Sequence, residues 1–170
     1  MNRSALCLLA LGLLAALCLY QARAGDEADK DGHAGAKGHK LVTPDMVKWG
    51  PAPPSLPPGA QLAVLDGDPA KAGAPYVLRA KLPDGYKVPP HWHPVDENVT
   101  VLKGALVMGL GEKFDKSAGK ELPVGSYSKM PKGVRHFAWA KGETVIQLNG
   151  TGPFEIHYVN PADDPRKKPR

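Results

Sequence analysis

Two histidines and a glutamate stand close together in "HWHPVDENVTVLKG", residues 91–104. Side chains alternate along a β-strand, so His91 and His93 would project from one face and Trp92 from the other. Two imidazoles on one face of a strand are placed to bind a single ion. A bend just before Glu97 would let the next strand return and bring that carboxylate to the same ion. The spacing therefore indicates a metal site built on strands.

A firmly held transition metal needs a third imidazole, and His136 in "PKGVRHFAW" is the candidate. Three imidazoles and one carboxylate suit one Mn, Fe, Co, Ni or Zn ion, and the lack of soft thiolate ligands after residue 18 argues against Cu(I). The alternative is a metal-free domain whose histidines only pack. A buried cluster of this kind without an ion would leave several polar groups in need of other partners.

Short strands are the elements that would position these residues. Between residues 61 and 160, strand-like runs alternate with turn signals, and only "KFDKSAGK" at 113–120 looks helical. This pattern predicts a single all-β domain, either a sandwich or a barrel. Gly104 and Gly142, each preceded by lysine, are expected to reverse the chain, because tight turns favour glycine. The expected strands are 61–65, 75–82, 86–93, 97–110, 125–131, 135–140, 143–148 and 154–160.

Residues 1–24 are typical of a secretory signal peptide. Arg3 supplies a positive start, Ala5 to Leu19 form an unbroken apolar core, and small residues precede a cleavage site after Ala24. We expect export to the periplasm or the cell exterior, with no membrane attachment after cleavage. A retained anchor is the weaker alternative, because a spanning helix needs about 20 apolar residues. Both cysteines of the chain would be removed with this segment, which excludes disulfides from the exported form.

The remaining segments lie on either side of the predicted barrel, residues 61–160. Residues 25–40 are small, charged and without hydrophobic period, which predicts a disordered linker. Residues 41–60 are rich in proline and are expected to wrap the outside of the barrel after one helical turn capped by Thr43. Residues 161–170 form a basic tail. Without the signal peptide, 20 Lys and Arg (22 minus 2) face 17 Asp and Glu, a net charge of +3 that does not indicate nucleic-acid binding.

Nine residues between positions 85 and 136 follow the spacing of a known family. They are Gly85, His91-x-His93, Glu97 and Gly104 in one group, and Gly125, Pro131-x-Gly133 and His136 in another. The two groups resemble the first and second motifs of the cupin superfamily. One position departs from the pattern, since Ala140 stands where the second motif usually ends in asparagine. That asparagine is not a metal ligand in the family, so the departure leaves the ion site intact.

The resemblance implies an RmlC-like cupin fold, which is a double-stranded β-helix or jelly-roll barrel, and a homodimer. It also implies that His91, His93, Glu97 and His136 point inward at one divalent transition metal. The chain is similar to small cupins related to the zinc-binding cupin-like domains of some anti-sigma factors, a group in which metal binding is better supported than catalysis.

Other side chains are expected to have structural roles. Trp92, Phe137 and Trp139 have the parity opposite to the histidines, so they should face away from the ion and pack against the N-terminal wrap or a dimer partner. Three polar residues on predicted strands are candidates to line a pocket beside the ion, but a structural role is favoured for each. They are Tyr127, Gln147 and His157.

Four protein ligands on an octahedral ion leave two positions for water, dioxygen or a chelating substrate. This predicts an oxygenase, decarboxylase or isomerase acting on a small oxygen-rich organic molecule, with no catalytic residue assigned. The chain shows no evident general base except Lys129. That lack favours the alternative, a non-catalytic module that binds metal or a small ligand for sensing, storage or structure. A third possibility is an interaction protein that works through its outward aromatic residues.

Overall fold

The structure, a computed structural model, describes residues 38–167. The chain divides into two units, residues 1–41 and 42–170. The predicted signal peptide and nearly all of the predicted linker therefore lie outside the described residues. Among the residues that are described, no helix is long and apolar enough to cross a membrane.

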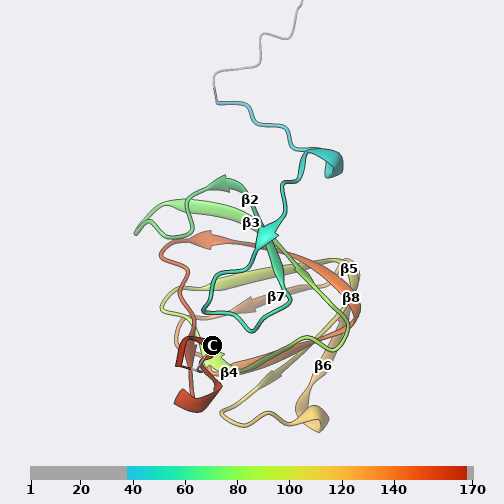
Figure 1. The fold of residues 1–170 in the computed structure, drawn as a ribbon, viewed down its shortest axis with the longest axis vertical. Coiled ribbons are helices and arrows are strands. Elements are labelled where there is room, and N and C mark those ends of the chain that lie inside the picture. Colours follow the sequence, from blue (N-terminus) through green and yellow to red (C-terminus); the bar gives the residue numbers. More distant parts are fainter. Residues whose placement is uncertain (1–37, 168–170) are drawn as a thin grey trace, which may run out of the picture. The chain divides into compact units, whose positions relative to one another are not determined.

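The described part of the chain is built from antiparallel strands, which curl around one interior (Figure 1). The strands are β1 (Gly50–Pro51), β2 (Gln61–Gly67), β3 (Pro75–Leu82), β4 (Lys87–Trp92), β5 (Glu97–Leu110), β6 (Lys120–Pro123), β7 (Tyr127–Met130), β8 (His136–Thr151) and β9 (His157–Tyr158). The 3-10 helices are η1 (Pro44–Met46), η2 (Lys116–Ala118), η3 (Pro161–Asp163) and η4 (Pro165–Lys167). The strand order is β1-β2-β3-β8-β4-β9, and β5 pairs with β6, β7 and β8. Because β8 pairs with β3, β4 and β5, it joins all parts of the sheet.

The two long strands β5 and β8 correct the predicted turns. Gly104 and Gly142 do not reverse the chain, because each lies inside a continuous strand and the runs 135–140 and 143–148 form the single strand β8. Both glycines have positive φ, and the β5–β8 register shifts between Lys103 and Ala105. A bulge uses the same backbone conformation as a turn but bends the strand instead of ending it. A Cβ atom at Gly104 would collide with the backbone of the facing strand, so β5 and β8 approach closely at this bend.

Two strands were missed by the sequence analysis. β1 contains a proline and has two residues, and β6 has the mostly polar sequence KELP, so neither carries a periodic signal. β6 exists because it pairs with residues 105–108 of β5. The predicted helical segment before it is reduced to the single turn η2, whose cap Asp115 accepts a hydrogen bond from the backbone N–H of Ser117.

The core lies inside the curled sheet. In β3 every second residue is buried, beginning with Tyr76 and Leu78, as expected for a strand with one face inward. Val99 and Val101 of β5 are 2% and 1% exposed and belong to the same cluster. The strand alternation that buries these apolar side chains also sets the direction in which the histidines point.

The segment 42–60 contains η1 and β1 and is fastened at its end by two tyrosines. The Tyr86 hydroxyl donates to the carbonyl of Pro57 at 2.6 Å, and the Tyr158 hydroxyl donates to the carbonyl of Ser55 at 2.9 Å. β1 pairs with β2, so this segment extends the sheet beside β2. The C-terminal segment lies beside β4 (Figure 1), with β9 paired to that strand.

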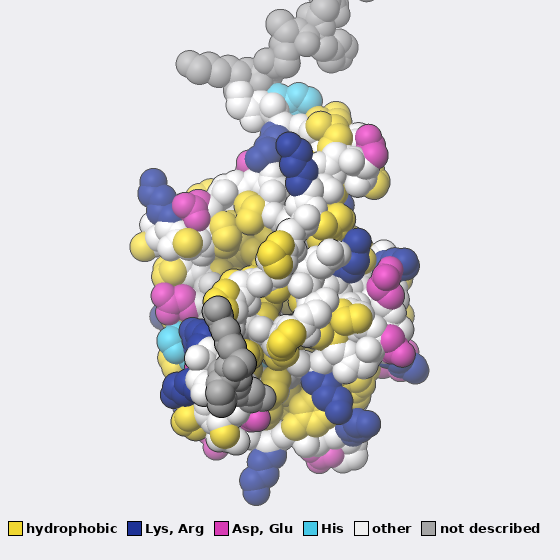
Figure 2. Space-filling model, in the orientation of Figure 1, with side chains coloured by type: hydrophobic (Ala, Val, Ile, Leu, Met, Phe, Trp, Pro, Cys, Tyr) yellow, Lys and Arg dark blue, Asp and Glu magenta, His cyan; other side chains and the backbone are white. Residues whose placement is uncertain are grey.

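The described part of the predicted basic tail contains η3 and η4. Within it, Arg166 makes an ion pair with Asp164, with Nε–Oδ1 at 2.8 Å. The face seen in Figure 2 has Lys and Arg interspersed with Asp and Glu around its edge, while hydrophobic side chains gather nearer its middle.

Candidate metal centre

His91 and His93 come from the end of β4. That strand contains Pro89 and Pro90, which lack the N–H that a sheet ladder uses, and its pairing with β8 shifts between Val88 and His91. After the shift, His91 pairs with His136, the first residue of β8, and their ring centroids are 4.1 Å apart. The interrupted ladder therefore places two of the predicted ligands side by side.

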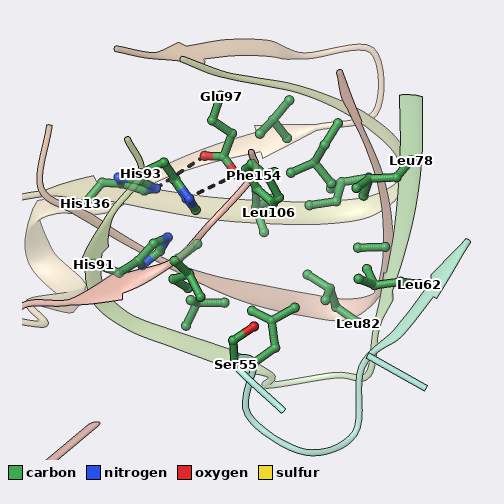
Figure 3. A pocket seen from close by; sticks show the side chains of 18 of the residues that line it. Ser55, Leu62, Leu78, Leu82, His91, His93, Glu97, Leu106, His136 and Phe154 are labelled. Atoms are coloured by element: carbon green, nitrogen blue, oxygen red, sulfur yellow. Dashed lines mark ion pairs between the residues drawn. The ribbon is translucent and has the colours of Figure 1, made fainter. Parts of the chain in front are cut away.

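Glu97 is the first residue of β5, directly after the bend that follows His93. Its Oε1 lies 3.7 Å from Nε2 of His93, and its Oε2 lies 3.3 Å from Nε2 of His136. Figure 3 shows the four side chains converging at one end of a pocket. None is more than 6% exposed. The structure thus brings together all four residues that the sequence analysis predicted as metal ligands.

Backbone carbonyls hold the orientation of each imidazole. Nδ1 of His91 lies 2.7 Å from the Pro89 oxygen, Nδ1 of His93 2.5 Å from the Glu155 oxygen, and Nδ1 of His136 3.0 Å from the Val134 oxygen. A carbonyl can only accept, so each Nδ1 carries the proton and donates it. The Nε2 atoms are left with lone pairs for an ion, which is the arrangement that commonly orients metal-bound histidines.

The polar atoms at the centre of the cluster fit a metal ion. The histidine ligand atoms lie within 4.8 Å of one another. Nε2 of His93 and Oε2 of Glu97 are buried without a hydrogen-bond partner. Lone pairs that face a carboxylate in a buried site repel one another unless a cation lies between them. The donor set of three imidazole nitrogens and one carboxylate suits a divalent transition metal.

The protonation states that a metal requires are favoured by the surroundings. Burial, together with the neighbouring His136 and His93, lowers the pKa of His91 to about 3. Burial also lowers the pKa of His93. Burial alone would raise the pKa of Glu97, but the close approach of His136, together with His93 and His91, outweighs it and lowers the value to about 2. A neutral His91 and an ionised Glu97 at neutral pH are ready to bind a cation without first losing protons.

A cavity of about 110 Å³ adjoins the four residues. His91, His93, Glu97 and His136 form one end of it, and aliphatic side chains from β2, β3, β5 and β8 form most of the rest. Figure 3 shows Leu62, Leu78 and Leu82 on the side away from the histidines, with Ser55 of the segment 42–60 beside them. The site therefore opens into a small, mostly apolar space.

Comparison with known proteins places the chain in a family. A family model described as "Domain of unknown function (DUF4437)" matches residues 40–170. The chain belongs to this family. A search of curated proteins finds no match for this DUF4437 chain.

Solved structures show the fold of the DUF4437 chain. The polyketide cyclase RemF from Streptomyces resistomycificus is similar with a TM-score of 0.57 and 19% identity, over 75% of this chain and 89% of RemF. An RmlC-like cupin from Shewanella frigidimarina NCIMB 400 has a TM-score of 0.51 and 12% identity, over 66% and 90%. KdgF from Halomonas sp. has a TM-score of 0.50 and 19% identity, over 67% and 94%. The predicted cupin jelly-roll fold is confirmed.

The outward aromatic residues face away from the site as predicted, and within the described chain they pack against segments other than the predicted N-terminal wrap. Phe137 and Trp139 pack against Phe114, from the loop after β5, with ring centroids 5.0 and 5.4 Å away. Trp92 stacks on His157 of β9 at 4.3 Å. Neither contact involves residues 41–60. The loop after β5 brings Phe114 to Phe137 and Trp139, and β9 brings His157 to Trp92. Strand parity predicts the face on which a ring lies but does not predict which distant segment covers it.

The polar residues considered for a pocket lining lie elsewhere. Tyr127 is 60% exposed, and its hydroxyl donates to Asn98. The Gln147 side chain accepts a hydrogen bond from Arg79, and His157 stacks on Trp92. Tyr127, Gln147 and His157 do not line the cavity described above.

One neighbour of the site was missed by the sequence analysis. The Phe154 ring stacks on the imidazole of His93, with centroids 4.7 Å apart and planes 16° apart, and it also lines the cavity. The next residue, Glu155, supplies the carbonyl that receives the His93 Nδ1 proton. A position 61 residues after His93 carries no local signal for this contact, because it depends on how the chain returns after β8.

Proposed function

We propose that this protein binds one divalent transition metal through His91, His93, His136 and Glu97 and is an exported metal-dependent cupin enzyme. Its substrate would be a small organic molecule with oxygen donors. The observation that carries the proposal is the convergence of three buried Nε2 atoms and one carboxylate at the end of a cavity. Such a cluster has a high electrostatic cost without a cation, and with one it faces a space where a ligand can bind.

When bound, the metal would supply Lewis-acid polarisation of a carbonyl or carboxylate, or activation of dioxygen. The residues of the chain have supporting tasks. The carbonyls of Pro89, Glu155 and Val134 fix the three imidazole rings by accepting their Nδ1 protons. Glu97 supplies the negative charge that partly neutralises the ion. The aliphatic wall excludes water, which strengthens the electrostatic interactions at the site.

The open space beside the cluster supports an enzyme. The segment 42–60 contributes Pro53, Ser55 and Leu56 to the cavity wall, and Ser55 stands apart from the histidines (Figure 3). A cavity of about 110 Å³ remains between this segment and the four residues. An oxygenase, a decarboxylase and an isomerase all require this kind of access. RemF, which has a similar fold, is a polyketide cyclase.

A non-catalytic metal-binding or sensing module is the second candidate, and the composition of the wall favours it. Among the described residues, the only polar side chains that line the cavity besides the four predicted ligands are Ser55 and Tyr86. The Tyr86 hydroxyl already donates to the Pro57 carbonyl, and burial raises its pKa. The described residues therefore offer no separate general acid or base at the site. Chemistry that needs one would have to use a predicted ligand or a water molecule.

Elemental analysis joined to an activity screen tests the two candidates. The protein would be purified without a histidine tag, and its metal content would be measured before oxygen consumption and carbon dioxide release are recorded on small carboxylates. Near-stoichiometric metal with turnover supports the enzyme. Metal without turnover on any class supports the binding module. A metal content far below stoichiometric, even after incubation with zinc, manganese and iron salts, contradicts both.

Export rests on the sequence of residues 1–24, which resembles a signal peptide. Intact-mass analysis of the protein recovered from its native cells tests it. A chain that begins at Gly25 and is found outside the cytoplasm supports export, and a chain that retains the segment in the cytoplasm contradicts it.

A further inference from the structure

The two ends of the cavity differ sharply in chemistry, and this difference points to a class of ligand. We propose that the site binds a small organic monoanion with an oxygen-chelating head for the metal and an uncharged hydrocarbon body for the apolar wall. The inference rests on the proposed function, because the head needs the metal. It goes further in excluding sugars, sugar acids and dicarboxylates, which a metal centre alone would also accept.

The body of the ligand would lie against aliphatic side chains. Leu62 of β2, Leu78 and Leu82 of β3, and Ile146 and Leu148 of β8 form much of the wall. Leu78, Leu82, Ile146 and Leu148 are buried and belong to the hydrophobic core. Figure 3 shows Leu62, Leu78 and Leu82 on the side of the cavity opposite the histidines. Each methylene that moves from water to such a wall contributes about 0.8 kcal/mol.

The charge of the site determines the charge that the ligand should carry. A divalent ion with the Glu97 carboxylate and three neutral imidazoles has a net charge of +1. Within residues 38–167, the cavity wall contains no lysine, no arginine and no carboxylate other than Glu97. A single negative charge on the ligand completes the balance, whereas a second negative charge on its body would be buried without a partner.

The lack of hydrogen-bonding groups in the wall determines that the body of the ligand should be apolar. The aliphatic part of the wall offers only the hydroxyls of Ser55 and Tyr86, and the Tyr86 hydroxyl already donates to Pro57. A sugar-like body would bring several hydroxyls into this space and leave most of them without partners. Each unpaired hydroxyl costs about 1–3 kcal/mol, so a polyhydroxy body is rejected even when its head chelates well.

The volume limits the length of the body. The cavity of about 110 Å³ is somewhat smaller than an engineered apolar cavity of about 150 Å³ that accommodates benzene. A body of about four to six carbon atoms is therefore expected to fill it. Longer chains meet the segment 53–57, which the hydroxyls of Tyr86 and Tyr158 hold in place through the carbonyls of Pro57 and Ser55.

Calorimetric titration of the zinc-loaded full chain with 2-hydroxy acids tests the class, because these compounds share one chelating head. Along glycolate, 2-hydroxybutyrate and 2-hydroxyhexanoate, we expect Kd to fall by about fourfold for each added methylene. Gluconate and 2-hydroxyadipate match 2-hydroxyhexanoate in length but have a hydroxylated and a charged body. Both should bind at least about tenfold more weakly than 2-hydroxyhexanoate, given the cost of unpaired polar groups. A flat series, or gluconate binding as tightly as 2-hydroxyhexanoate, overturns the inference.

A substitution in the apolar wall tests whether the hydrocarbon body and the chelating head of the ligand bind at opposite ends of the cavity. Leu62 is only half-buried, so Leu62→Asn should fold and place an amide in the wall. We expect the affinity for 2-hydroxyhexanoate to fall by about tenfold while that for glycolate stays nearly unchanged, since only the body loses apolar contact. Leu110→Asn is the matched control, because Leu110 is 64% exposed and lies outside this cavity. An equal loss for both acids, or an equal loss in the control, contradicts the inference.

The zinc content, measured before each titration, separates failure of this inference from failure of the proposed function. If the protein retains no zinc, the proposed metal centre is wrong and the inference falls with it. If zinc is bound stoichiometrically but the acids show no preference for a hydrocarbon body, the metal centre stands and only the ligand class is wrong. The series on the unchanged protein gives this answer even if Leu62→Asn does not fold.

Discussion

His136 and Phe137 are neighbours in β8 and have opposite surroundings. His136 is 1% exposed and points to the inner face, where it meets His91 and Glu97. Phe137 is fully buried on the outer face, where it packs against Phe114. One step along a strand therefore separates a polar cluster with unpartnered atoms from an aromatic cluster.

Burial has different consequences on the two faces of β8. On the outer face the rings pack closely, and a Cβ atom at Gly109 would collide with the Phe137 ring. Close apolar packing of this kind stabilises the fold. On the inner face, Nε2 of His93 and Oε2 of Glu97 are buried without partners, which lowers stability unless a cation binds. Changes on the outer face should therefore affect folding, and changes on the inner face should affect binding.

Phe137→Ala should have the largest effect, and it should act on stability. Removal of a fully buried phenylalanine is expected to lower the free energy of unfolding by about 3–5 kcal/mol, because a cavity remains. Urea denaturation measures the change, and zinc titration at low temperature should show a much smaller change in affinity. Leu110→Ala is the control, because this exposed side chain should change stability by less than about 0.5 kcal/mol. A large loss of zinc affinity together with unchanged stability would remove the distinction between the faces.

Glu97→Gln should act on binding. It keeps the shape of the side chain but removes the negative charge beside His93 and His136. We expect zinc affinity to fall by more than about 100-fold, because even loss of a group that only orients a ligand costs about 10–100-fold. Competition with a chromophoric chelator measures it. Glu121→Gln is the matched control, since that carboxylate pairs with Lys141 on the surface. Unchanged affinity in Glu97→Gln would show that Glu97 is not a ligand.

The stability of chelator-treated protein should depend on pH because His91 and Glu97, on the inner face, have shifted pKa values in the folded chain. The pKa of His91 is lowered from 6.5 to about 3, so between these values the unfolded chain binds a proton that the folded chain does not. Stability is therefore full above about 6.5 and falls as the pH decreases toward 3, by at most about 1.4 kcal/mol per pH unit for this group. The lowered pKa of Glu97 adds a further loss as the pH falls from 4.5 toward 2.

Urea denaturation at a series of pH values measures this dependence. His91→Gln should make the slope between pH 6.5 and 4.5 shallower, because the group that takes up the proton is gone. Phe137→Ala should shift the whole curve down without changing the slope. An identical slope in His91→Gln and the unchanged protein would contradict the assignment to His91.

Strand alternation made the two faces predictable from sequence. The spacing of His91 and His93 places both on one face, and the opposite parity of Trp92, Phe137 and Trp139 places them on the other. Both placements agree with the structure, as does the position of Glu97 after the bend. The predicted turn at Gly104 was wrong, because a bulge and a turn use the same positive φ and only the partner strand distinguishes them.

By itself the sequence determined most of the strands, the cupin fold and the four residues that meet at the centre, because these follow from local periodicity and motif spacing. Tertiary structure alone decided what surrounds them. The Glu155 carbonyl that orients His93, the stacking of Phe154 on His93 and the apolar wall opposite come from segments far from β4 in the chain. Their meeting depends on how the sheet curls and how its loops return, which no local pattern records.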